Sequence, residues 1–206
     1  MRSRTRLIPR VGLVSFVALL AMTITSPVLR GEAEHVRWDI INVAFTTPST
    51  VSAGGVAYAF ARNPSTMKIK LTGSGTFVAP ASGGESSAVT GGGTWQTFNC
   101  PTPATCVSTG AGTYSVTRLV SWEFASFQTP GALNDLIGPD GANGNAVFRI
   151  EYSDGSEGTL GIGCHGPGAP NGIIEGVIAT KDFVTYWDAQ APVAGVNADR
   201  TSFHIE

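Results

Sequence analysis

One stretch of this 206-residue chain decides its fold class. It reads Phe148-Arg149-Ile150-Glu151-Tyr152-Ser153-Asp154-Gly155-Ser156-Glu157-Gly158-Thr159-Leu160-Gly161-Ile162-Gly163-Cys164. Apolar residues recur at every second position on both sides of a Ser-Asp-Gly turn, which predicts an antiparallel hairpin. A two-residue loop would put the apolar side chains of the two strands on opposite faces. A three-residue loop with a left-handed Gly155 puts them on one face, as listed here: Phe148, Ile150, Tyr152, Leu160, Ile162 and Cys164. We therefore expect the three-residue loop, which pairs Phe148 with Leu160.

The rest of the chain carries the same kind of pattern. Short β-branched or aromatic segments are separated by Gly, Pro, Asn and Asp, and no amphipathic helix stands out. The expected strands cover residues 36–45, 56–60, 67–71, 76–78, 88–98, 112–127, 146–152, 159–164 and 173–180. The expected loops are 80–84, 101–104, 129–145 and 166–172. This predicts one all-β domain over residues 34–206, an antiparallel barrel of about eight to ten strands, with a two-sheet β-sandwich as the alternative.

The N-terminus has the pattern of a secretory signal peptide. Four arginines precede about a dozen apolar residues, and small residues at Gly31 and Ala33 favour cleavage after residue 33. Residues 1–33 are therefore expected to direct secretion or another extracytoplasmic location. Their removal takes away five of the 13 basic residues and one of the 15 acidic residues, leaving 8 and 14 and a net charge of −6. Like charges repel, so nucleic acid is not expected as a partner, nor is stable membrane insertion after signal removal.

The three cysteines fit an exported protein. Cys100 and Cys106 flank a short loop with two prolines, and pairing is the default in an oxidising compartment. We therefore expect a Cys100–Cys106 disulfide, worth about 2 kcal/mol by the loop-entropy model. Cys164 would then be a free, buried, small apolar residue.

Several turn and strand motifs carry a family resemblance. These motifs are Trp38-Asp39-Ile40, Val51-Ser52-Ala53-Gly54-Gly55, Leu71-Thr72-Gly73-Ser74-Gly75-Thr76-Phe77, Val89-Thr90-Gly91-Gly92-Gly93-Thr94-Trp95 and Glu151-Tyr152-Ser153-Asp154-Gly155-Ser156. Between about Trp38 and Trp187 the chain resembles a family of uncharacterised bacterial β-rich proteins. That resemblance implies a fold and brings no activity, ligand or catalytic residue with it.

Two motifs suggest ligands but are better explained by turns. Residues 161–166 spell G-x-G-x-x-G, yet a Pro- and Gly-rich loop follows where a dinucleotide site needs a helix, so no cofactor is expected. Asp140, Asn143 and Asn145 offer oxygen ligands at the spacing of a calcium loop. The closing Glu of such a loop is absent, and Asn- and Gly-rich segments are typical of turns, so no metal is predicted and these three residues are only a calcium candidate.

Five ionisable residues are the candidates for catalysis. Glu175 and Glu123 lie in apolar segments, and Arg118 and Arg149 lie on expected strands, so a Glu/Arg site in a barrel mouth is the sharpest enzyme hypothesis. The alternative is a structural ion pair between Glu175 and one of these arginines. His165 opens a Gly/Pro loop where a general base could sit, but the sequence gives it no nucleophile.

Three function classes remain open. The first is an exported, non-enzymatic β domain that binds a small molecule or a surface partner. The second is a small barrel enzyme of isomerase or hydrolase type that uses the Glu/Arg site. The third is a carbohydrate-binding or adhesive module in which Trp95, Trp122 and Trp187 form a sugar platform, although tryptophans are more often core residues.

Overall fold

The chain forms one extensively hydrogen-bonded β-sheet in a computed structural model that describes residues 33–206 apart from 82–83, 103–104 and 194. The predicted signal peptide lies outside these residues except for Ala33. The strands are β1 (Glu34–Ala44), β2 (Ser49–Ala53), β3 (Ala57–Ala61), β4 (Met67–Leu71), β5 (Ser74–Ala79), β6 (Gly92–Thr102), β7 (Thr105–Phe127), β8 (Leu133–Asp135), β9 (Gly141–Tyr152), β10 (Glu157–Cys164), β11 (Gly176–Lys181), β12 (Val184–Ala189) and β13 (Gly195–Ile205). No helix within the described ranges is long and apolar enough to cross a membrane.

The strand pairings close into a ring. They can be followed through β1, β5, β6, β4, β3, β12, β11, β10, β9 and β13 and back to β1. All strand pairs are antiparallel except β2 with β8, which are parallel. The predicted all-β, antiparallel class is confirmed. The ring is compatible with a barrel and with two packed sheets, so the choice between them stays a prediction.

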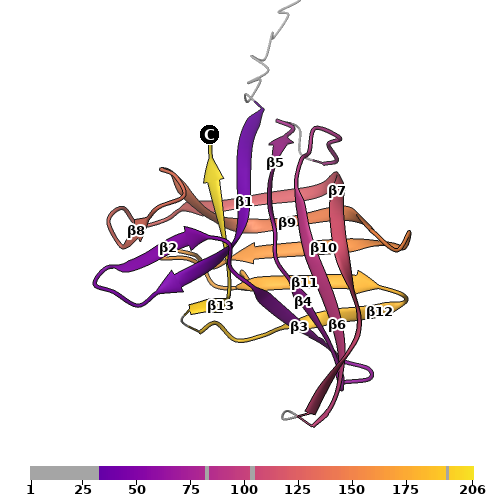
Figure 1. The fold of residues 1–206 in the computed structure, drawn as a ribbon. Helices are drawn as coiled ribbons and strands as arrows, with labels where there is room; N and C mark the ends of the chain where they lie inside the picture. Colours follow the sequence, from indigo (N-terminus) through magenta and orange to yellow (C-terminus); the bar gives the residue numbers. More distant parts are fainter. Residues whose placement is uncertain (1–32, 82–83, 103–104, 194) are drawn as a thin grey trace, which may run out of the picture. The chain divides into compact units, whose positions relative to one another are not determined.

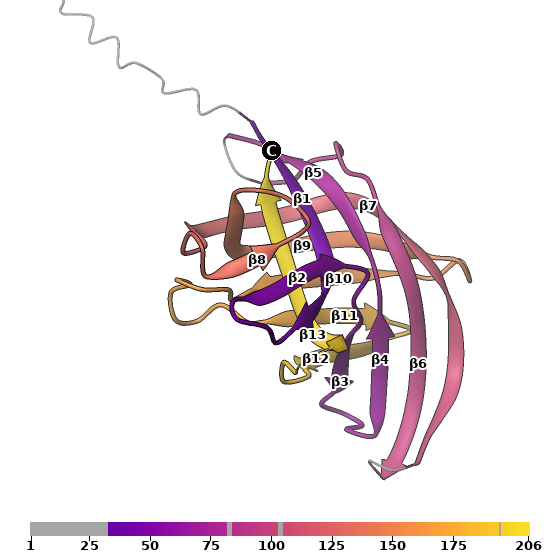
Figure 2. The ribbon, with the colours of Figure 1, turned by 60° about the vertical axis from the view of Figure 1, so that its left-hand side comes forward.

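Two sets of strands cross in the described part of the chain. In Figure 1, β1, β5 and β6 run up the view, whereas β9, β10, β11 and β12 run across it. Figure 2 shows the same crossing from another side. The long strand β7 joins the sets, because its first half pairs with β6 and its second half pairs with β9. The pairing of β7 with β9 has register shifts, which mark β-bulges. Bulges let a strand bend, so β7 can pass from one set of strands to the other.

The hairpin of residues 148–164 has the predicted register. Leu160 pairs with Phe148 and Gly158 with Ile150, and Gly155 has a φ of 85° at the end of the turn. All six apolar side chains of the predicted face are buried in the main core. The alternation of apolar residues therefore selected the correct loop length, as a one-residue slip would have turned one strand's apolar face outward.

The core lies between the crossing strands and is rich in aromatic rings. Phe77 packs edge-on against Phe148, Trp122 and Phe203, and Trp38 packs on Phe148. These rings come from strands far apart in the sequence. Burial of the aromatic side chains therefore ties the two sets of strands together.

Several elements differ from the prediction. Strands β2, β8, β12 and β13 were not expected, and residues 133–135 and 141–145 of the predicted long loop belong to β8 and β9. Strand β11 begins after Glu175 rather than at residue 173. The segment 101–104 was expected to be a loop, but β6 runs to Thr102 and β7 begins at Thr105.

The predicted disulfide is confirmed. Cys100 and Cys106 are joined at the β6–β7 turn, and Cys164 is free and buried. A disulfide is typical of a protein from an oxidising, extracytoplasmic environment.

Asp199 should give the stability of the fold a pH dependence. Its carboxylate is fully buried, and it accepts hydrogen bonds from the Tyr58 amide at 2.7 Å and the Gln190 side chain at 2.8 Å. Burial raises the pKa of Asp199 to about 6, despite these bonds and the nearby Lys68. The folded state therefore holds the proton more tightly than the unfolded chain, and this group's contribution to stability falls as the pH rises from about 4 to about 6.

We expect Asp199→Asn to remove this dependence. Asparagine keeps an acceptor for the Tyr58 amide, can donate to the carbonyl of a flipped Gln190, and tolerates the positive φ of 54° at this position. The melting temperature of the variant relative to the parent should rise between pH 4 and pH 6. Thermal unfolding of both proteins between pH 4 and pH 6 measures this difference in melting temperature. A difference that stays the same across the range would contradict the role assigned to Asp199.

Candidate functional site

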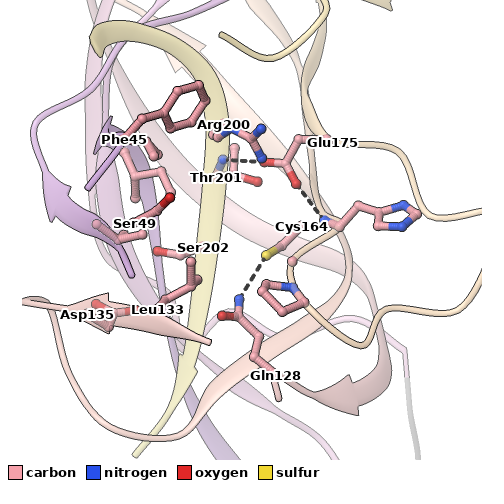
Figure 3. A pocket seen from close by; sticks show the side chains of 16 residues that line it. Phe45, Ser49, Gln128, Leu133, Asp135, Cys164, Glu175, Arg200, Thr201 and Ser202 are labelled. Carbon is pink, nitrogen blue, oxygen red and sulfur yellow. Dashed lines mark hydrogen bonds between the residues drawn. The ribbon is translucent and has the colours of Figure 1, made fainter. Parts of the chain in front are cut away.

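A cavity of about 360 Å³ lies on the side of β1 and β13 that faces away from the main core. Figure 3 shows Phe45, Ser49, Leu133 and Asp135 on one side of it, Glu175, Cys164 and Gln128 on the other, and β13 between them. Its volume falls within the range of small-ligand pockets, about 300–1,000 Å³. The remaining lining residues are Ile41, Val43, Val51, His165, Gly166, Pro167, Arg200, Thr201 and Ser202.

One wall of the cavity is apolar. Ile41, Val43 and Val51 are buried in a second, smaller core cluster, and Leu133 packs against it. This cluster exists because β1 is buried on both faces, with Trp38 and Ile40 in the main core and Ile41 and Val43 in the second cluster. Strand β2 continues this face beside β1, pairing Val51 with Val43, and β8 pairs with β2 beyond it.

Glu175 forms part of the opposite, polar wall. Its Oε1 accepts a hydrogen bond from the Thr201 amide at 2.8 Å, and its Oε2 accepts one from the His165 amide at 2.7 Å. Burial raises the pKa of Glu175 above its ordinary value, although these amides and the nearby Arg200 act in the opposite direction. The carboxylate thus joins the β10–β11 loop to β13.

A hydrogen bond between two side chains holds β8 against β13. Asp135 Oδ2 lies 3.0 Å from Nε2 of the buried His204, and Oδ1 accepts a hydrogen bond from the Ile137 amide at 2.9 Å. Burial raises the pKa of Asp135, but these hydrogen bonds outweigh it, so the net shift is downward. The pair fixes one edge of the cavity.

The loop after β10 forms the floor beside Cys164. The Gly166 amide donates to Asn143 Oδ1 at 2.8 Å, and Gln128 Nε2 donates to Cys164 Sγ at 3.4 Å. Burial raises the pKa of the Cys164 thiol strongly, so it stays protonated and is a poor nucleophile.

The cavity gathers only some of the predicted site residues. Glu175 and His165 line it, whereas Glu123, Arg118 and Arg149 are exposed elsewhere on the sheet. The predicted ion pair of Glu175 with a strand arginine is wrong, because Arg118 pairs with Glu85 at 2.7 Å and the Glu175 oxygens bind backbone amides. The arginine beside Glu175 is Arg200, which the sequence had not singled out.

His165 and the calcium candidates have local structural roles. His165 Nδ1 lies 2.9 Å from the Ile173 carbonyl oxygen, so its ring is bound to the loop rather than to a nucleophile. Asn143 is fully buried and anchors Gly166, as described above, while Asp140 is exposed and has a positive φ. No cluster of three or more metal-ligating His, Cys, Asp or Glu side chains occurs among the residues that the structure describes.

The three tryptophans of the predicted sugar platform do not share one exposed surface. Trp95 is buried in the main core, and Trp122 packs against that core. Trp187 alone is largely exposed. The rings therefore serve mainly as core residues, the alternative noted for them above.

No family model, curated protein or solved structure matches this chain. Its function has to be argued from the geometry of the cavity, and the family resemblance of its turn motifs stays a prediction.

Sequence reasoning missed most of the polar wall because it missed β13. Arg200, Thr201 and Ser202 lie on this strand, and Asp135 and Leu133 lie on β8, within a segment that was expected to be a loop. A usable signal was present, since Thr201, Phe203 and Ile205 alternate as strand-forming residues.

Proposed function

We propose that this protein is a non-enzymatic, extracytoplasmic binding protein for a small, partly apolar molecule, and that the cavity between β8 and β13 is its binding site. One observation carries the proposal: the cavity has an apolar wall, and opposite it Arg200 and Ser202 have buried polar atoms without a hydrogen-bond partner among the described residues. Ligand sites combine a mostly apolar lining with a few such polar groups. The disulfide supports an extracytoplasmic location.

The state of the polar groups favours binding over catalysis. A general base acts from within hydrogen-bond reach of the substrate, and a nucleophile needs activation by such a base. Each oxygen of Glu175 is bound to a backbone amide, the His165 ring is bound to a carbonyl group, and the Cys164 thiol has a raised pKa. These groups hold the cavity together.

A matched pair of leucine variants tests the site. Leu133 lines the cavity, whereas Leu136, three residues on, is 66% exposed and outside it. Leu133→Trp should fill part of the cavity and weaken binding of the neutral dye N-phenylnaphthylamine by about tenfold or more, the equivalent of ~1.4 kcal/mol. Leu136→Trp should bind the dye like the parent.

Fluorescence titration of the full chain measures both affinities. If both variants weaken dye binding equally, or if the parent binds the dye and Leu133→Trp does not change its affinity, then the dye binds outside this cavity. A parent protein that binds no dye would count against the proposed function itself.

A further inference from the structure

Two residues of β13 that line the cavity each have a buried hydrogen-bond donor without an acceptor among the described residues. Arg200 Nε and Ser202 Oγ are buried atoms without a hydrogen-bond partner, and both residues line the cavity. Residues two apart on a strand share a face, so the two side chains lie on the same side of β13. Ser202 is only 2% exposed. A buried donor without an acceptor costs about 1–3 kcal/mol, so an acceptor that reached these two groups would be stabilising.

The neighbouring carboxylates are already engaged. Glu175 accepts from two backbone amides, and Asp135 accepts from Ile137 and His204. Asp39, which pairs across from Ser202, accepts two hydrogen bonds from Arg37 at 2.8 and 3.0 Å. Arg200 and Ser202 therefore line a cavity whose acidic side chains already accept hydrogen bonds from other residues, and their donors suit an acceptor brought in by a ligand.

We propose that the cavity binds a small monocarboxylic acid, whose carboxylate accepts hydrogen bonds from Arg200 and Ser202 and whose hydrocarbon part packs against Ile41, Val43 and Leu133. The inference rests on the proposed binding function and adds the ligand class. A guanidinium group suits a carboxylate because its N–H groups form a planar fork that matches two oxygens.

The charges around Arg200 favour a monoanion. Glu175 lies beside Arg200 on the polar wall, so a dianionic phosphate would meet stronger repulsion than a carboxylate (Figure 3). The apolar wall offers no hydrogen bonds to further anionic oxygens. A hydrocarbon chain or ring can instead bury its surface there, at about 25 cal/mol per Å².

Three ligands of equal chain length test the headgroup. Calorimetric titration of the full chain with octanoate, octanol and octylamine compares an anion, a neutral alcohol and a cation on the same apolar tail. Octanoate should bind about tenfold more tightly than either of the others, because hydrogen bonds to a charged group contribute more than neutral ones. Octanol binding as tightly as octanoate, or a preference for octylamine, would overturn the assignment.

Two variants test the donors. Arg200→Met should weaken octanoate binding about tenfold or more while octanol stays within about twofold, and Ser202→Ala should weaken octanoate by about fivefold. Ser202→Ala should also melt at or above the parent temperature, since it removes an unpartnered buried hydroxyl. Arg149→Met, at an exposed arginine on β9, is the control and should leave all three affinities unchanged.

The outcomes separate this inference from the proposed function. If the neutral dye binds at Leu133 but Ser202→Ala and Arg200→Met bind octanoate like the parent, the carboxylate assignment fails and the binding site stands. If neither the dye nor any eight-carbon ligand binds, both fail. Should Arg200→Met not fold, Arg200→Lys takes its place, because lysine keeps the charge and removes the Nε donor.

Discussion

Gly93→Ala should abolish or nearly abolish folding. Strand β6 passes directly against the β4–β5 connection, where the Thr72 amide donates to the Thr94 carbonyl at 3.1 Å. A β-carbon on Gly93 would overlap the Thr72 carbonyl oxygen and lie 2.6 Å from its carbon and 2.7 Å from the Gly73 α-carbon. All three atoms belong to the backbone, so no side chain can move aside. We expect a loss of about 4 kcal/mol or more, a large part of the 5–15 kcal/mol typical of a domain.

Gly138→Ala is the matched control. A β-carbon there would meet only the His204 ring, at the ordinary contact distance of 3.7 Å. Its free energy of unfolding should stay within about 0.5 kcal/mol of the parent. Urea unfolding followed by circular dichroism measures both variants. A Gly93→Ala protein as stable as Gly138→Ala would show that β6 can move away from the β4–β5 connection.

Lys181→Ala should cause the second largest loss, about 3 kcal/mol. The Lys181 side chain is 2% exposed, and its ammonium group contacts Asp154, Asp182 at 2.9 Å and Ser156 at 2.8 Å. The same group lies 4.3 Å from the centre of the Trp95 ring and 4.6 Å from that of Tyr152. Burial lowers the pKa of Lys181, but its hydrogen bonds to the two aspartates outweigh this, so it stays charged.

The expected loss has two sources. Alanine removes a buried side chain whose ammonium group lies over two aromatic rings, and it leaves Asp154 without the cation that helps lower its pKa to about 2. Both aspartates are partly exposed, so water compensates part of the lost ion pairs. Lys70→Ala, at a lysine on β4 that forms no ion pair among the described residues, is the control and should cost less than about 1 kcal/mol. Equal melting temperatures for the two variants would contradict a structural role for Lys181.

The strands that could be predicted from the sequence are those in which apolar and polar residues alternate regularly. The hairpin of residues 148–164 could be predicted to the register, because its apolar residues lie on one face and its turn contains a glycine. Strand β13 gives a weaker signal than the hairpin, since it buries Asp199, Ser202 and His204 among its few alternating strand-forming residues. Polar residues at buried positions hide the alternation that identifies a strand, and their partners come from distant segments.

Only part of the candidate site could be predicted from the sequence, again because buried polar residues obscure the strand pattern. Glu175 was a candidate because its neighbours are apolar, and it does line the cavity. A companion arginine was sought on the strands with the clearest alternating pattern, whereas the arginine that lines the cavity is Arg200, on β13, where the pattern is weak. A carboxylate that binds backbone amides of Thr201 and His165 leaves no signature in the sequence, because any residue can supply the amide.

The pairing of β1 with β13 also has a consequence for how the chain matures. Val36 pairs with Ile205, so most of the polypeptide must be synthesised, and translocated if it is exported, before β1 meets this partner. Until then one edge of β1 is open, and this strand carries Trp38 and Ile40, which are fully buried in the finished fold. An open apolar strand edge can pair with another chain. Pairing with β13 therefore closes an edge of β1 that could otherwise join another copy of the chain.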